Sequence, residues 1–165
     1  MFVIFFNGDS LKKINKKLVI SIIIPIFVGF ISYLLSSKGI RNFDLLKKPF
    51  LAPPSFLFPI VWTILYLLMG YSSYLVYESN DYHSSCCLLI YIVNLFLNFL
   101  WTPIFFEFEL RLFALIIILL LDLVIIYMIY CFYGVNKKAA YLQIPYLVWC
   151  LFATYLNLSI YLLNR

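Results

Sequence analysis

The chain has 165 residues, of which 65% are hydrophobic and only 12% are charged, and its mean hydropathy is +1.03. Soluble domains are about 45–50% apolar and about 25% charged, so a water-soluble fold is excluded and we expect the excess apolar surface to face lipid. The net charge of +5 comes from lysines and arginines between apolar runs, which favours anchoring at lipid headgroups over binding to nucleic acid.

The first long apolar stretch, Leu18–Leu35, follows four lysines at positions 12, 13, 16 and 17. A signal peptide has the same order of basic and apolar regions, but its apolar core is shorter and is followed by an Ala-x-Ala-like site, which this sequence lacks. We therefore expect a retained first transmembrane helix, and we assign no role to Met1–Ser10.

Later stretches are also long enough to cross a membrane, since a helical span takes about 20 residues. A transmembrane β-barrel would instead show shorter segments of alternating hydrophobicity, and these stretches do not alternate. The fold class that we expect is an all-α membrane protein, a five-helix bundle that forms a single domain over residues 1–165. Its helices are expected at about 18–36, 56–77, 85–106, 112–132 and 139–163.

The connection between the first two helices, Lys38–Ser55, is long for a compact bundle. Prolines at positions 49, 53 and 54 remove backbone donors and restrict the residues before them, so this part cannot be a regular helix. Long connections are often functional. We expect an ordered, proline-stiffened loop here, whereas the other connections are short and join antiparallel neighbours.

Three of the expected helices carry aromatic and weakly polar residues on one face. At helical spacing these are Trp62, Tyr66, Met69, Gly70, Ser73 and Tyr77 in the second helix, Asn94, Asn98 and Trp101 in the third, and Pro145, Trp149, Ala153 and Asn157 in the fifth. An amide in hydrocarbon is costly without a partner, so the asparagines should point into the bundle. Two interpretations stay open: an aromatic-lined cavity for a flat apolar ligand, or asparagines that bond between helices while the rings fill the core or the interfacial belt.

The remaining reactive side chains give narrower expectations. Asp122, in the middle of the fourth stretch, is either a functional acid or a neutral acid bonded to an Asn or Tyr side chain. His83 lies in a short loop beside Asp81 and is expected at the surface rather than on a metal. The cysteines lack the spacing of a metal or redox site, so we expect small buried hydrophobes and no metal centre.

The motifs on these helices resemble those of a known family. The run Lys48–Pro54, followed by Pro59–Gly70, looks like the first loop and second helix of the translocator protein family, also called the TspO/MBR or tryptophan-rich sensory protein family. Leu97–Phe106 is similar to the third helix of that family, and Pro145–Trp149 with Phe152–Asn157 is similar to its fifth.

The resemblance implies a five-helix bundle whose first loop covers a pocket, in a homodimer within a bacterial or archaeal cell membrane or the mitochondrial outer membrane. It implies a receptor or sensor for porphyrin, haem, cholesterol or similar flat apolar ligands, with no required cofactor. The ligand-binding residues that it implies are Phe43, Trp62, Tyr66, Asn98, Phe105, Trp149 and Ala153. Asp122 departs from the family pattern, whose acid in the fourth helix aligns with Ile117.

Two other functions stay open. Some members of the family are proposed to degrade porphyrin in light through paired tryptophans, and Trp62 and Trp149 match that pair, but the sequence supplies no acid and base beside them. The other function is transport of tetrapyrroles or sterols, with Asp122 as a proton-coupled site, although the inverted repeats of many secondary transporters are missing from the sequence.

Overall fold

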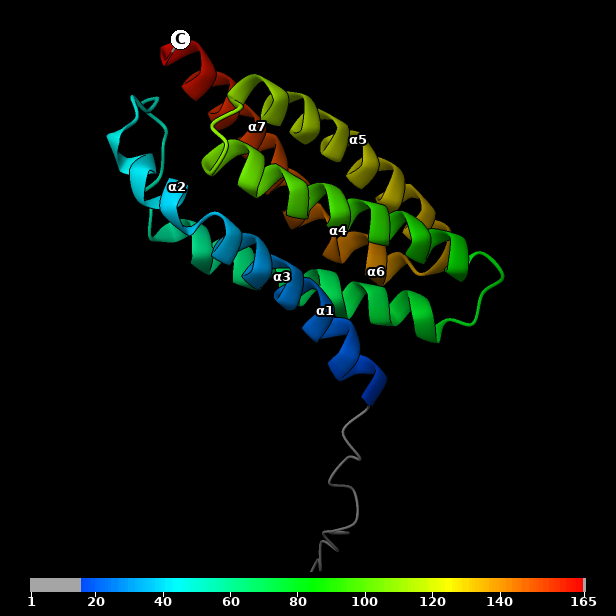
Figure 1. Cartoon of the computed structure of the whole chain (residues 1–165). Helices are drawn as coiled ribbons and strands as arrows, with labels where there is room; N and C mark the ends of the chain where they lie inside the picture. The colour runs from blue at the N-terminus through cyan, green and yellow to red at the C-terminus, as the bar shows by residue number, and fades with distance from the viewer. Residues whose placement is uncertain (1–15, 165) are drawn as a thin grey trace, which may run out of the picture.

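The computed structural model describes residues 16–164, and residues 1–15 and 165 of the expected domain lie outside this part. Its helices are α1 (Lys16–Leu35), α2 (Ser37–Asn42), the 3-10 helix η2 (Phe43–Leu45), α3 (Leu57–Glu78), α4 (Ser84–Phe106), α5 (Arg111–Val135), α6 (Lys137–Leu142) and α7 (Ile144–Leu163) (Figure 1). Within the described residues, five segments are long and apolar enough to cross a membrane, with α6 and α7 together forming the fifth. The expected fold class is confirmed.

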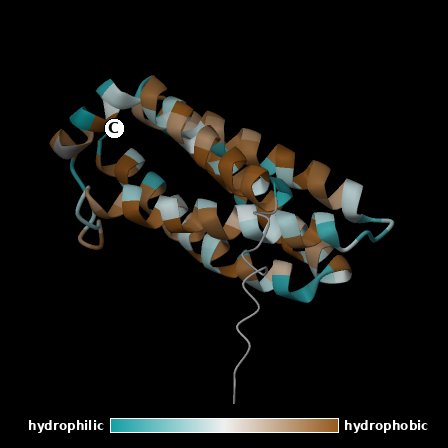
Figure 2. Cartoon of the chain, turned by 90° about the horizontal axis from the view of Figure 1, so that it is seen from below, coloured by the Kyte–Doolittle hydropathy of each residue, from teal (hydrophilic) through white to brown (hydrophobic). Residues whose placement is uncertain are grey.

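The long helices lie side by side in a bundle (Figure 1). Helix α1 packs against α3 and α4, and α5 packs against α4 and α7, while α6 closes the bundle against α3. Large apolar side chains cover the outside along the helices, and hydrophilic residues gather toward the ends (Figure 2). Phe27 and Phe96, for example, are each 58% exposed. Such a surface is suited to hydrocarbon, where helices satisfy their own backbone hydrogen bonds.

The fifth span is interrupted at Gln143, where a single helix over 139–163 was expected. Pro145 lies in the first turn of α7 and has no N–H to donate to the carbonyl four residues earlier, so the helix cannot run through regularly. The Gln143 N–H turns back to the Ala140 carbonyl at 3.0 Å. The Gln143 side chain is fully buried, and its amide has no partner among the described residues.

The first long connection is more regular than expected. Its proline-rich part, residues 47–54, consists of turns and irregular backbone, but the chain before it forms α2 and η2. Helix α2 is held against the end of α4, because the Gly39 N–H donates to Glu107 Oε2 at 3.1 Å. A Cβ atom at Gly39 would overlap the Phe106 carbonyl, so this close approach depends on glycine.

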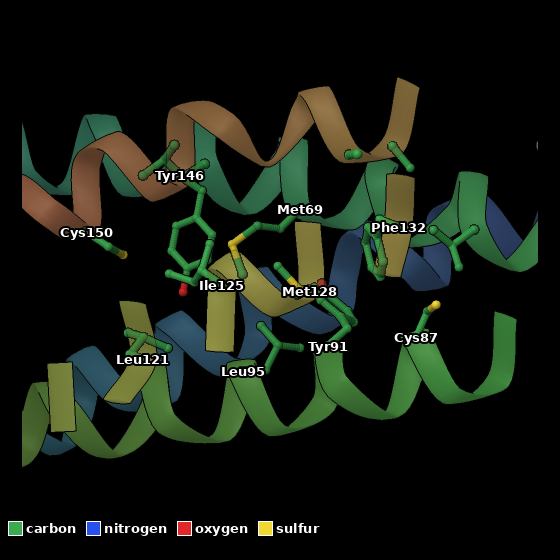
Figure 3. Packing of buried hydrophobic residues seen from close by; sticks show 14 residues of the cluster. Met69, Cys87, Tyr91, Leu95, Leu121, Ile125, Met128, Phe132, Tyr146 and Cys150 are labelled. Atoms are coloured by element: carbon green, nitrogen blue, oxygen red, sulfur yellow. The ribbon is translucent and has the colours of Figure 1, made fainter. Parts of the chain in front are cut away.

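The centre of the bundle is filled by apolar side chains from four spans. Met69, Ile125, Met128 and Phe132 are completely buried. Figure 3 shows Tyr146 reaching from α7 into this core, among Met69 and Ile125. The core therefore places one hydroxyl group of α7 deep between the other helices.

The free cysteines and the histidine differ in exposure. Cys87 and Cys150 are buried, as expected, and Cys131 is half-buried. Cys86 is exposed, so the expectation of a buried hydrophobe is wrong there, because it lies on the outward side of the first turn of α4. His83 is exposed at the start of the same helix, and its backbone N–H donates to Asp81 Oδ1 at 2.8 Å.

Candidate functional site

The expected tryptophans of α3 and α7 each contact aromatic rings of the other helix and pack on the same apolar cluster. Trp62 lies 5.5 Å from Tyr66 and 6.2 Å from Tyr146, measured between ring centroids. Trp149 packs edge-on against Phe58 at 6.0 Å. Both pairs that cross from α3 to α7, Trp62 with Tyr146 and Phe58 with Trp149, are T-shaped, an arrangement that aromatic rings favour.

A chain of buried hydrogen bonds runs beside these rings. The Tyr66 hydroxyl donates to Asn98 Oδ1 at 3.1 Å, and Asn98 Nδ2 donates to the Tyr146 hydroxyl at 3.1 Å. The Tyr146 hydroxyl in turn donates to Asn94 Oδ1 at 3.3 Å. Both asparagine side chains are buried, as expected, and the chain links α3, α4 and α7.

The lid expected from the first loop is represented by Phe43 of η2, which is 6% exposed. Its ring lies 5.8 Å from Phe58, 6.3 Å from Phe105 and 5.4 Å from Phe106. Lys48 Nζ lies 4.4 Å from the Phe43 ring centroid, a cation–π contact. Since Phe58 also touches Trp149, it joins the rings under η2 to the rings between α3 and α7.

Ala153 packs into the same cluster as Phe43, Trp101 and Phe105. Trp101 and Phe105 are stacked at 5.3 Å on α4, and the small Ala153 side chain of α7 leaves room for them. Asn157 fixes this region: in the amide orientation that satisfies both neighbours, its oxygen accepts from Trp101 Nε1 at 3.0 Å and its nitrogen donates to the Arg111 carbonyl at 3.1 Å.

Six of the seven expected site residues thus belong to two adjoining apolar clusters joined by the contact of Phe58 with Trp149. The seventh, Asn98, bonds to Tyr66 and Tyr146 of the first cluster. Their side chains fill the space between α3, α4 and α7. A hollow of about 10 Å³ lies beside Phe43 and Phe105, and a larger one of about 420 Å³, at Tyr161, adjoins it through Glu109 and Arg111, which line both. Within the described part of the chain, Trp149 Nε1 and Asn94 Nδ2 are buried donors that have no acceptor.

Sequence reasoning missed two residues of the site. Phe58 lies one turn before Trp62 on the same helix face, so the spacing that identified Trp62 and Tyr66 also pointed to it. Tyr146 lies three residues before Trp149, but its role depends on reaching the amides of α4. No local pattern gives that contact.

Asp122 is buried at the contact of α5 with α7. The Thr154 hydroxyl donates to Asp122 Oδ2 at 2.7 Å, so its partner is a threonine and not the expected Asn or Tyr. Asp122 Oδ1 is buried without a partner in the described chain. Ile117, the position of the family's acid, packs instead in the cluster of Phe43, Trp101 and Ala153.

A bundle of five apolar spans with a buried aromatic and amide core defines an integral, multi-pass membrane protein. The model of the TspO/MBR family matches residues 21–163, and the chain belongs to this family. It is 38% identical over 149 residues to the tryptophan-rich protein TspO of Archaeoglobus fulgidus, covering 90% of this chain and 97% of that protein. It is 35% identical over 138 residues to the human translocator protein, covering 82% and 80% respectively. It is 34% identical over 122 residues to the tryptophan-rich sensory protein of Cereibacter sphaeroides, covering 74% and 76%.

Proposed function

We propose that this protein is a membrane receptor or sensor for a flat apolar ligand of the porphyrin class, bound between α3, α4 and α7 beneath η2. The observation that carries the proposal is the convergence of aromatic rings from α3 and α7 beside one chain of buried hydroxyls and amides that includes α4. The relatives named sensory protein and translocator protein agree with a receptor role.

The chemistry of the residues suits a tetrapyrrole. Trp62, Trp149 and Phe58 offer ring faces and edges to an extended π-system. Trp149 Nε1 and Asn94 Nδ2 are donors without an acceptor among the described residues, and a ligand with carboxylates or ring nitrogens would supply acceptors. Apolar walls with a few placed donors are typical of small-molecule sites.

Binding requires the rings to move apart, because side chains fill the space between the helices. The segment α2–η2 is held against the bundle by the Gly39–Glu107 hydrogen bond and by the packing of Phe43 on its neighbouring rings. We infer that the ligand enters when Phe43 leaves these rings and Phe58 turns away from Trp149.

Titration of the purified protein with protoporphyrin, followed by tryptophan quenching, tests the proposal. Replacing both Trp62 and Trp149 by alanine leaves Trp101 as the reporter. Aromatic contacts contribute about 0.5–1.5 kcal/mol each beyond area burial, so the double variant should bind about tenfold or more weakly. The matched control is Phe96→Ala on the lipid-facing side of α4. Equal affinity in the double variant and the wild type would refute the assignment of the ligand site to Trp62 and Trp149.

A further inference from the structure

A second hollow lies on the outer surface of the bundle, lined by the start of α5 and the end of α7. It has a volume of about 420 Å³ and is lined by Glu109, Arg111, Phe113, Ile116, Tyr161 and Asn164, among others. None of the seven expected ligand-binding residues lines it. It adjoins the small hollow beside Phe43 and Phe105, which Glu109 and Arg111 also line, but it contains none of the side chains proposed to bind the ligand there.

The apolar wall of this hollow faces lipid. Leu112, Phe113 and Ile116 project from the first two turns of α5 and are 51%, 54% and 55% exposed. Because α5 spans the membrane, its first turns lie at the boundary between hydrocarbon and headgroups. An acyl chain that lies along α5 would cover these side chains.

The polar end of the hollow carries one cation and one anion. Arg111 Nη2 lies 3.3 Å from Glu109 Oε2, and the Arg111 side chain is only 16% exposed, compared with 57% for Glu109. The wall beside them is fixed, because the Asn164 side chain accepts from the Lys47 N–H at 3.0 Å and donates to its carbonyl at 2.9 Å. The hollow thus presents a charge pair at a defined place.

The Arg111 guanidinium has one N–H group that makes no hydrogen bond within the described residues. Its Nε is buried and has no acceptor within the described residues. A buried donor of a charged group is unfavourable without an acceptor. Phosphate oxygens are favourable acceptors for guanidinium N–H groups, and headgroup phosphates lie at this depth of the bilayer.

We propose that this hollow binds phosphatidylethanolamine from the bilayer. In the lipid-bound state the Arg111 side chain turns toward the hollow so that its Nε, which is closed to solvent in this structure, donates to the phosphate. The ammonium donates to the Glu109 carboxylate, and an acyl chain lies along Phe113 and Ile116. The balance of one positive and one negative group selects this headgroup. Glu109 disfavours a headgroup with a net negative charge, and a choline headgroup has no N–H to donate to the carboxylate.

The test measures which lipids stay bound to the full-length protein. The protein is purified from bilayers with equal amounts of phosphatidylethanolamine, phosphatidylglycerol and phosphatidylcholine, and retained lipid is counted by native mass spectrometry. We expect phosphatidylethanolamine to exceed each of the others by about fivefold or more. Equal retention of the three lipids by the wild type, or a hollow that holds water alone, overturns the proposal.

Variants of each group make the test specific. Arg111→Gln should lower phosphatidylethanolamine retention about tenfold, the effect expected for losing one charge-assisted contact. Glu109→Gln should abolish the preference over phosphatidylglycerol. Ile116→Trp fills the apolar part of the hollow and leaves both charges in place. It should therefore lower the retention of all three lipids, and it tests the proposal even if Arg111→Gln does not fold.

The matched control is the ion pair at the opposite end of the bundle. Lys17 Nζ and Glu78 Oε1 are also 3.3 Å apart, but neither residue lines this hollow. Lys17→Gln should leave retention unchanged. A loss in Lys17→Gln equal to that in Arg111→Gln, or full retention in Arg111→Gln, refutes the assignment. Porphyrin binding should not change in Ile116→Trp or Lys17→Gln, because neither residue lines the hollow beside Phe43 and Phe105. A lipid effect of Ile116→Trp without a porphyrin effect separates this site from the one between α3 and α7.

Discussion

Asn98 is the amide on which the buried hydrogen-bond chain depends, and Asn98→Leu removes it while keeping the branching and the number of heavy atoms of the side chain. The change removes the bonds to Tyr66 and Tyr146, both 3.1 Å long, while Tyr146 keeps its bond to Asn94. Interhelical hydrogen bonds in membrane proteins contribute about 0.6–1.7 kcal/mol each, so the loss should be about 1–3 kcal/mol. For a chain of this length that corresponds to a fall of roughly 3–10 °C in the unfolding midpoint.

Thermal unfolding in detergent measures this fall through the reaction of Cys87 and Cys150 with a thiol-reactive fluorophore. Both are buried in the folded protein, so in a background with Cys86→Ser and Cys131→Ser, which removes the more accessible thiols, labelling reports unfolding. Phe96→Leu, on the lipid-facing side of α4, is the control and should leave the midpoint within about 1 °C. A double-mutant cycle with Tyr66→Phe should give a coupling of about 0.5–2 kcal/mol. A coupling of zero would show that this hydrogen bond does not hold α3 to α4.

Two further changes test close contacts in the bundle. Gly29→Ala should lower both the unfolding midpoint and the protoporphyrin affinity, because a Cβ atom there would overlap the Tyr66 ring, whereas Gly134→Ala, with open space around it, should change neither. Thr154→Val should destabilise the protein by about 1 kcal/mol because it leaves the Asp122 carboxyl without its donor, while Asp122→Asn keeps an acceptor and should change the midpoint little. Equal midpoints for Gly29→Ala and Gly134→Ala, or for Thr154→Val and the wild type, would contradict these contacts.

Composition and segment length were sufficient to predict the spans, because hydrocarbon leaves a chain few ways to satisfy its backbone. The ends of the spans were less well predicted, since helix termini are decided by local packing. Helix α5, for instance, begins at Arg111 and runs to Val135, beyond the expected 112–132. The break before α7 had a signal in Pro145, which the search for long apolar runs did not use.

The inward direction of Asn94 and Asn98 was predictable from the cost of an amide in lipid. Their partners were not, because the Tyr146 hydroxyl reaches them across a contact between α7 and α4 that no sequence spacing encodes. The same holds for Asp122, which bonds to Thr154 of another helix. Likewise, the first loop was expected to be ordered, but its helix α2 depends on the close approach of Gly39 to the end of α4.

The two interpretations of the polar faces, helix pairing and ligand binding, are compatible in this protein. Asn98 and Asn94 do bond between helices, which is what pairing requires. A core built for pairing alone would also use the remaining donors, yet Asn94 Nδ2 and Trp149 Nε1 have no acceptor among the described residues. Buried donors without partners are unfavourable. A molecule that supplies acceptors would therefore gain binding free energy from these hydrogen bonds in addition to that from ring stacking. The hydrogen bonds that close the bundle show helix pairing, and under the proposed function a ligand would open this packed region and use the two donors left over.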